Sequence, residues 1–233
     1  MKLFFVLTIM VLSLFGNAQH TGTTGDMRNF AAQTQVVYEL NPFGKKGNVV
    51  GSQFLFADWV KGKVINREGV EFTAGLFNFN KMSQSLFIQL NDTSKTVAFQ
   101  VDKRQLKSIY LSDETGSYLL EKVAALDTNS FYRAIAKGSK YSLYSLIKTK
   151  FIPSNYESNG IVSSGNLYDE YKDEVTYYVV FANGSVHEIS LKKKSVKSVF
   201  EAEKEKVDQF YKASADDEQN EDFLSRLVTS LNQ

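Results

Sequence analysis

The feature that most limits the fold is a change of period along the chain. From residue 37 to about residue 191, short apolar and aromatic runs alternate with turn residues, which is the pattern of antiparallel β structure. The 18 Phe and 12 Tyr fit this pattern, because aromatic side chains favour pleated, half-buried surfaces. Beyond residue 191 the apolar residues recur at helical spacing. The sequence therefore predicts an α+β fold, in which a mainly antiparallel β sheet or sandwich over residues 37–191 precedes a C-terminal helical segment over residues 192–233 that packs on it.

Two hairpins can be placed within the β-rich region. Residues 59–65 and 70–79 are predicted to pair around a turn, and the phase of apolar alternation changes near Gly75, which favours a bulge there. Residues 175–191 are predicted to form a second hairpin around Asn183-Gly184, the preferred pair for a type I′ turn. If Asn183 and Gly184 form a two-residue loop, the pairing of the two strands places His187 opposite Val180. Further strands are predicted near residues 86–90, 97–101, 109–111, 118–126, 131–136 and 141–152, and Asn220 is predicted to cap the last helix.

The first 18 residues have the pattern of a secretory signal peptide. Lys2 precedes an uncharged apolar run over residues 3–15, and the small residues Gly16 and Ala18 fit a signal-peptidase site. That run is too short for a transmembrane helix, which needs about 20 residues. We therefore predict cleavage after Ala18, a flexible leader over residues 19–36, no transmembrane segment after cleavage, and an exported protein that is periplasmic, extracellular or associated with the outer membrane.

Composition excludes several classes of function. The chain has no Cys, so neither disulfides nor lipid attachment at a cysteine can occur. Its 27 basic and 26 acidic side chains give a formal net charge of +1, so the overall charge gives no electrostatic argument for nucleic-acid binding, and we predict no nucleic-acid partner. Stability must come from packing, and a chain of this size buries roughly 70% of its unfolded surface.

Few residues suit catalysis. His20 and His187 are the two histidines of the chain, which effectively excludes both a multi-histidine zinc site and a histidine-based triad. The sequence contains no glycine-rich phosphate loop, nucleophile elbow or zinc-protease motif. We therefore assign no catalytic residue, no metal ligand and no cofactor, and we lean against an enzyme.

One acidic and aromatic segment is the candidate ligand-binding site. Tyr168, Glu170, Tyr171 and Asp173 follow a Gly-, Ser- and Asn-rich stretch over residues 158–166. Two carboxylates on opposite sides of a sugar bond are the minimal machinery of a glycosidase, and aromatic side chains can bind sugars or peptides. The simpler interpretation, which we prefer, is a solvated acidic loop that leads into a strand.

The stretch over residues 51–90 resembles a group of exported Bacteroidota proteins of unknown function. The resemblance is carried by Gly51-Ser52-Gln53-Phe54-Leu55, by the lysine-glycine step Val60-Lys61-Gly62, and by the alternating Phe77 and Phe79. Residues 174–178 and 191–210 are similar as well, so that the likeness extends over residues 51–232. It implies export, a β-rich body and C-terminal helices, and it implies no activity and no catalytic residue.

Three functions are compatible with these features. The preferred hypothesis is a non-catalytic binding or structural module of the cell envelope with an envelope protein as its partner, because hairpin edges and aromatic surfaces suit strand addition and surface recognition. The alternatives are a carboxylate-based hydrolase acting on glycan or peptide, and an outer-membrane-associated β protein. The sequence leaves the oligomeric state and the identity of the partner open.

Overall fold

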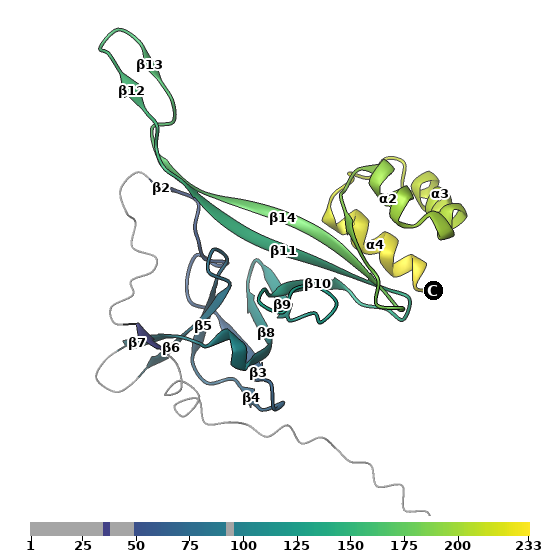
Figure 1. The fold of residues 1–233 in the computed structure, drawn as a ribbon, viewed down its shortest axis with the longest axis horizontal. Coiled ribbons are helices and arrows are strands. Elements are labelled where there is room, and N and C mark those ends of the chain that lie inside the picture. Colours follow the sequence, from purple (N-terminus) through teal and green to yellow (C-terminus); the bar gives the residue numbers. More distant parts are fainter. Residues whose placement is uncertain (1–34, 38–48, 92–95) are drawn as a thin grey trace, which may run out of the picture.

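The computed structural model describes residues 35–37, 49–91 and 96–233 of the chain. Within these residues, two main β sheets precede a group of C-terminal helices (Figure 1), so the predicted α+β, β-rich class is confirmed. The predicted signal peptide and nearly all of the predicted leader lie outside the described residues. No helix among those described is both long enough and apolar enough to cross a membrane.

The smaller sheet has four antiparallel strands in the order β1-β7-β6-β5. They are β1 (Gln35–Val37), β5 (Leu76–Asn80), β6 (Ser85–Asn91) and β7 (Thr96–Gln100). β1 begins inside the stretch expected to be leader, and it pairs with β7. A short 3-10 helix, η1 (Lys103–Gln105), then leads from this sheet into the larger one.

The larger sheet runs in the order β15-β14-β11-β10-β9-β8-β3-β4, and β2 pairs in parallel with β14. Its strands are β2 (Val49–Val50), β3 (Lys61–Asn66), β4 (Glu71–Phe72), β8 (Leu106–Asp113), β9 (Gly116–Glu121), β10 (Tyr132–Ala136), β11 (Tyr141–Ile152), β14 (Asp169–Phe181) and β15 (Val186–Ile189). Its two longest strands, β11 and β14, pair without interruption along their length.

Gly75 marks a passage between the two sheets, so the predicted bulge is wrong. β4 pairs with β3 in the larger sheet, whereas β5, which follows Gly75, pairs with β6 in the smaller one. Gly75 has a φ of 107°, and a Cβ there would lie 2.9 Å from the carbonyl oxygen of Gln89. The change in apolar phase therefore reflects a change of sheet, for which glycine supplies both the backbone freedom and the space.

The Asn183-Gly184 hairpin also differs from its prediction. The Phe181 N–H donates to the carbonyl of Ser185 and the Gly184 N–H donates to the carbonyl of Phe181, which closes a three-residue loop. Gly184 has a φ of 82°, and Asn183 instead accepts the Ser185 N–H at 2.9 Å through its side chain. The extra loop residue moves the register by one, so His187 lies opposite Val179 and not opposite Val180.

The C-terminal segment forms α2 (Lys193–Val199), the 3-10 helix η2 (Glu201–Glu203), α3 (Lys204–Ala213) and α4 (Glu221–Leu231). Asn220 caps α4 as predicted, because its side chain accepts the Phe223 N–H at 3.0 Å. The apolar face of α4 packs on one end of the β11–β14 hairpin. That packing forms a core that includes Leu143, Val179, Val207, Leu224, Leu227 and Leu231.

A second core lies between the smaller sheet and the β3–β8–β9 part of the larger sheet. It contains Phe77, Phe79, Leu86, Ile88, Leu106, Ile109, Leu111 and Phe131. The two cores are therefore built from different stretches of the chain, and the β11–β14 hairpin contributes Leu143 and Val179 to the one next to the helices.

Beyond the body, β11 and β14 continue as a projecting hairpin (Figure 1). It ends in the two-stranded pair β12 (Glu157–Ser158) and β13 (Ser163–Ser164). We call residues 148–176, which make up this distal part of the hairpin and its end, the arm.

Candidate functional site

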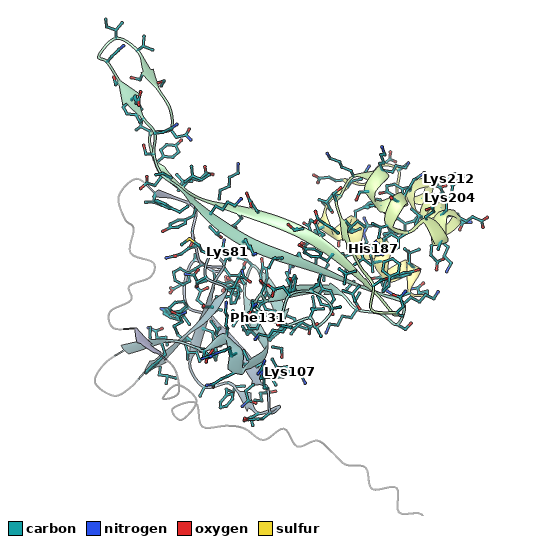
Figure 2. The ribbon with its side chains drawn as sticks, in the orientation of Figure 1. Lys81, Lys107, Phe131, His187, Lys204 and Lys212 are labelled. Carbon is teal, nitrogen blue, oxygen red and sulfur yellow. The ribbon has the colours of Figure 1, made fainter. Side chains whose placement is uncertain are left out.

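An ion pair fixes the base of the arm to the body. Thr149 and Asp173 face each other across β11 and β14, and the Thr149 hydroxyl donates to Asp173 at 2.5 Å. The Nζ of Lys81, in the turn between β5 and β6, lies 2.6 Å from the other carboxylate oxygen of Asp173, and its side chain is only 8% exposed. Figure 2 shows Lys81 at this junction. The smaller sheet therefore holds the arm through a nearly buried ammonium.

Gln84 locks the same turn against β11. Its side-chain amide donates to the carbonyls of Lys81 at 2.8 Å and Ile147 at 2.9 Å, while its oxygen accepts the N–H of Phe131 at 3.2 Å. The backbone of Gln84 has a φ of 52°, a conformation that costs energy for a residue with a Cβ. The three hydrogen bonds of the buried amide hold the turn in that conformation.

A small cavity lies beside this junction. Its volume is about 10 Å³, and its lining is Leu55, Phe79, Lys81, Leu120, Phe131, Arg133, Ser145 and Ile147. The buried hydroxyl of Ser145 has no hydrogen-bond partner among the described residues. This volume is close to the minimum for one water molecule, and substrate pockets measure about 300–1,000 Å³. The cavity is therefore a packing feature and not a substrate site.

The four residues chosen from the sequence lie at the start of β14. The strand begins at Asp169, so the acidic segment is a strand and not the solvated loop that the sequence suggested. Tyr171 and Asp173 point to one face and Glu170 to the other, because successive side chains of a strand alternate. Tyr171 packs on Phe151 with a ring-centroid distance of 5.1 Å. Tyr168, just before the strand, is 50% exposed.

The two carboxylates of the hydrolase hypothesis do not converge. Glu170 and Asp173 extend from opposite faces of β14, and Asp173 is already bonded to Lys81 and Thr149. A retaining or inverting glycosidase needs both carboxylates on the same substrate. In the part of the chain that the structure describes, no group of three His, Asp or Glu side chains could hold a metal ion.

Exposed apolar side chains concentrate on the arm. Seven of the ten large hydrophobic side chains that are exposed among the described residues lie there: Phe151, Tyr156, Ile161, Val162, Leu167, Tyr168 and Val175. Ile161 is 93% exposed, and Val162 is 63% exposed. Apart from Tyr168, sequence reasoning missed this group. The available signal was an apolar pair, Ile161-Val162, in the middle of a Ser-, Gly- and Asn-rich stretch.

The end of the arm is a hydrogen-bonded turn. Asn159 accepts the N–H groups of Ile161 at 3.1 Å and Val162 at 2.8 Å, and Gly160 between them has a φ of 83°. The Tyr156 and Ser163 hydroxyls, which lie on the two sides of the turn, are 2.9 Å apart. Ile161 and Val162, which we call the tip, are therefore held on an ordered turn that exposes both side chains.

A second set of bonds ties the two sides of the arm together below the tip. The Ser154 N–H donates to Asp169 at 2.7 Å, the Ser154 hydroxyl donates to the carbonyl of Asn166 at 2.7 Å, and the Asn166 N–H donates to the Asn155 side chain at 2.7 Å. These side-chain bonds take over where the β11–β14 pairing stops at Ile152 and Glu170. The arm is thus cross-linked by hydrogen bonds from its base to its tip.

Burial changes the acidity of tyrosines in the body. It raises the pKa of Tyr144, on β11, to about 12, and it also raises the pKa of Tyr178 on β14. Burial and the nearby Glu221 carboxylate raise the pKa of Tyr177. These side chains lie on the part of the hairpin that packs against the body, and burial of a phenol disfavours its charged form. They report packing and not a catalytic arrangement.

Comparisons with known proteins found no match for this chain. No family model matches the sequence, and neither the curated proteins nor the solved structures contain a match.

Proposed function

We propose that the protein is an exported, non-catalytic binding module of the cell envelope, and that it engages a protein partner through the arm. The carrying observation is the concentration of exposed apolar side chains on a projecting hairpin, with Ile161 and Val162 at its end. Contiguous exposed apolar surface marks interaction sites in folded proteins. Export rests on the signal-peptide pattern over residues 1–18.

The anchoring of the arm supports this role. The Lys81–Asp173 ion pair and the Gln84 hydrogen bonds fix its base, and the Asn159 bonds order its tip. A recognition element that is already ordered loses less conformational entropy when it binds. An unsupported two-stranded hairpin is marginally stable in water, so these contacts also explain how the arm can project at all.

The positions of Glu170 and Asp173 near the start of β14 favour a binding function over hydrolysis. Asp173, one of the two carboxylates that a hydrolase would use, bridges the arm and the smaller sheet. Glu170 projects from the opposite face of the strand. Asp173 therefore has a structural role that a binding module would use and that a hydrolase pair would not allow.

In-cell crosslinking of the protein with a C-terminal affinity tag tests the proposal. The test variant carries Ile161→Asp and Val162→Asp, which removes the apolar tip. The control is Tyr110→Asp, because Tyr110 is also an exposed apolar residue, 38% accessible, but lies on β8 in the body. We expect an envelope protein to be captured by the wild type and the control and lost with the tip variant. Equal capture by the tip variant would refute a role for the tip.

A further inference from the structure

β14 has an open edge at the base of the arm. On one side it pairs with β11 along residues 170–181. On the other side it pairs with β15 at residues 177–180 and with β2 at residues 169 and 170. No described strand occupies the second side between these two contacts. Gly51 lies directly against the carbonyl of Tyr171, so the free part of the edge is residues 172–176, which we call the open edge.

The backbone of the open edge presents hydrogen-bonding groups outward. The N–H and carbonyl of Phe181 point toward the β15 side, since they bond to Ser185 and Gly184. The register of β14 is continuous, and backbone groups alternate along a strand. The N–H and carbonyl groups of Asp173 and Val175 therefore point out of the open edge. None of the described residues forms a further strand there to bond them.

The two faces of the open edge differ in chemistry. Val175 is 44% exposed and shares its face with Asp173, whose carboxylate is bonded to Lys81. The opposite face carries Lys172 and Glu174. A strand that paired here would thus have alternate side chains next to an apolar surface and next to charged groups.

Lys172 gives this edge a charge preference. It lies directly opposite Lys150 in the β11–β14 ladder, and like charges in that position are destabilising. Lys150 forms its ion pair with Glu174 at 2.7 Å, and Lys172 has no ion pair among the described residues. A carboxylate on an added strand, opposite Lys172, would balance this charge. Charged residues also protect open edges from unselective pairing. Lys172 would therefore disfavour the pairing of an added strand that lacks this carboxylate.

We infer that the partner adds an antiparallel strand to the open edge, with an acidic residue opposite Lys172 and an apolar residue opposite Val175. This inference rests on the proposed function and names the partner's binding element as an extended peptide segment of a protein. Five residues at about 3.3 Å each give a length of about 17 Å, so the paired segment is short. Its pattern, from N to C, is an apolar residue followed three positions later by Asp or Glu.

The first test uses a peptide of that pattern, acetyl-Thr-Val-Thr-Thr-Glu-amide, and the backbone amide NMR spectrum of the mature chain. We expect saturable shifts centred on the amides of Asp173 and Val175. The same peptide N-methylated at its Val, whose N–H faces β14, should not bind, whereas methylation at the middle Thr, whose N–H points away, should be tolerated. Shifts confined to other residues, or no shift at millimolar peptide, would overturn the inference.

Two variants separate pairing from folding. Val175→Pro removes an outward N–H without touching the β11 ladder, and we expect it to abolish peptide binding. Lys172→Glu should weaken the peptide about fivefold, and a peptide with Lys in place of its Glu should recover that loss. Because the rescue requires a folded edge, it keeps the inference testable even if the proline variant unfolds. A Lys172→Glu variant that binds both peptides equally would contradict the charge preference.

The inference and the proposed function can fail separately. In the in-cell crosslinking experiment, a Val175→Pro variant that still captures the partner, while the tip variant loses it, overturns strand addition and leaves the arm as the binding element. Capture retained by the tip variant but lost with Val175→Pro overturns the role of the tip and supports the open edge. If both the tip variant and Val175→Pro lose the partner, and the peptide binds as expected above, the results support both the role of the tip and strand addition at the open edge.

Discussion

The β11–β14 hairpin has two halves with the same pairing and opposite surroundings. In the half next to the helices, Leu143 and Val179 are completely buried, whereas in the arm Phe151 and Val175 are 45% and 44% exposed. The register between the strands is continuous through both halves. Backbone pairing therefore does not decide which half is core. What decides it is whether another element covers the face, and the arm extends past every element that covers the other half (Figure 1).

The difference between the halves leads to a division of roles. The half that packs against α4 contributes to stability through buried apolar area. The arm contributes little burial, and it depends on the Lys81–Asp173 ion pair and on hydrogen bonds to keep its direction. Substitutions in the two halves should therefore separate stability from binding.

The largest expected effect is on the helix core. Leu227, in α4, is completely buried, and Leu227→Ala should lower the free energy of unfolding by about 2–5 kcal/mol. Ile161→Ala in the tip should change it by less than about 0.5 kcal/mol. Chemical denaturation of both variants measures the difference. Similar losses for the two would mean that the arm is part of the cooperative core.

The anchor of the arm should have an intermediate effect. Asp173→Ala leaves the ammonium of Lys81, whose side chain is 8% exposed, without its carboxylate, and the expected loss is about 1–3 kcal/mol. Glu174→Ala is the matched control on the adjacent position, because its ion pair with Lys150 has both side chains more than half exposed and contributes less than about 1 kcal/mol.

Hydrogen exchange shows where that loss occurs. In the Asp173→Ala protein, amides of the arm should exchange faster while those of α4 keep their protection. Uniform acceleration through the helices would show that Asp173 supports the whole fold and not the direction of the arm.

A smaller effect concerns pH. Burial raises the pKa of Tyr144 to about 12 from its ordinary value of 10.0, so the folded protein retains this proton at pH values where the unfolded chain has lost it. The contribution of this protonated tyrosine to the free energy of unfolding is therefore fully present below about pH 10, and it is lost as the pH rises toward 12. Denaturation measured across this range should show a decline that Tyr144→Phe reduces. An equal decline in that variant would assign the effect to the other buried tyrosines.

The sequence predicted the local elements well where the pattern is local. The strand over residues 141–152 and the Asn220 cap are observed as predicted, since each depends on neighbouring residues. The predictions at Gly75 and at Asn183-Gly184 are wrong, because Gly75 lies at a change of sheet and Gly184 closes a three-residue loop. Apolar alternation does not reveal which sheet a strand joins.

The candidate site was only half predictable. Tyr168, Glu170, Tyr171 and Asp173 all lie on the arm, but the partner of Asp173 is Lys81, which is 92 positions away in the chain. The exposure of Ile161 and Val162 depends on β11 and β14 being longer than the elements beside them. Both are properties of the assembled fold, and no local pattern carries them.

Photo-crosslinking from a single position tests the central claim most directly. A photoreactive amino acid replaces Ile161 in the tip or Tyr110 in the body, and the tagged proteins are irradiated in cells at equal expression. If the arm is the binding element, position 161 gives a specific crosslinked partner and position 110 gives none. A partner that crosslinks from position 110 and not from position 161 would contradict the arm as the binding element.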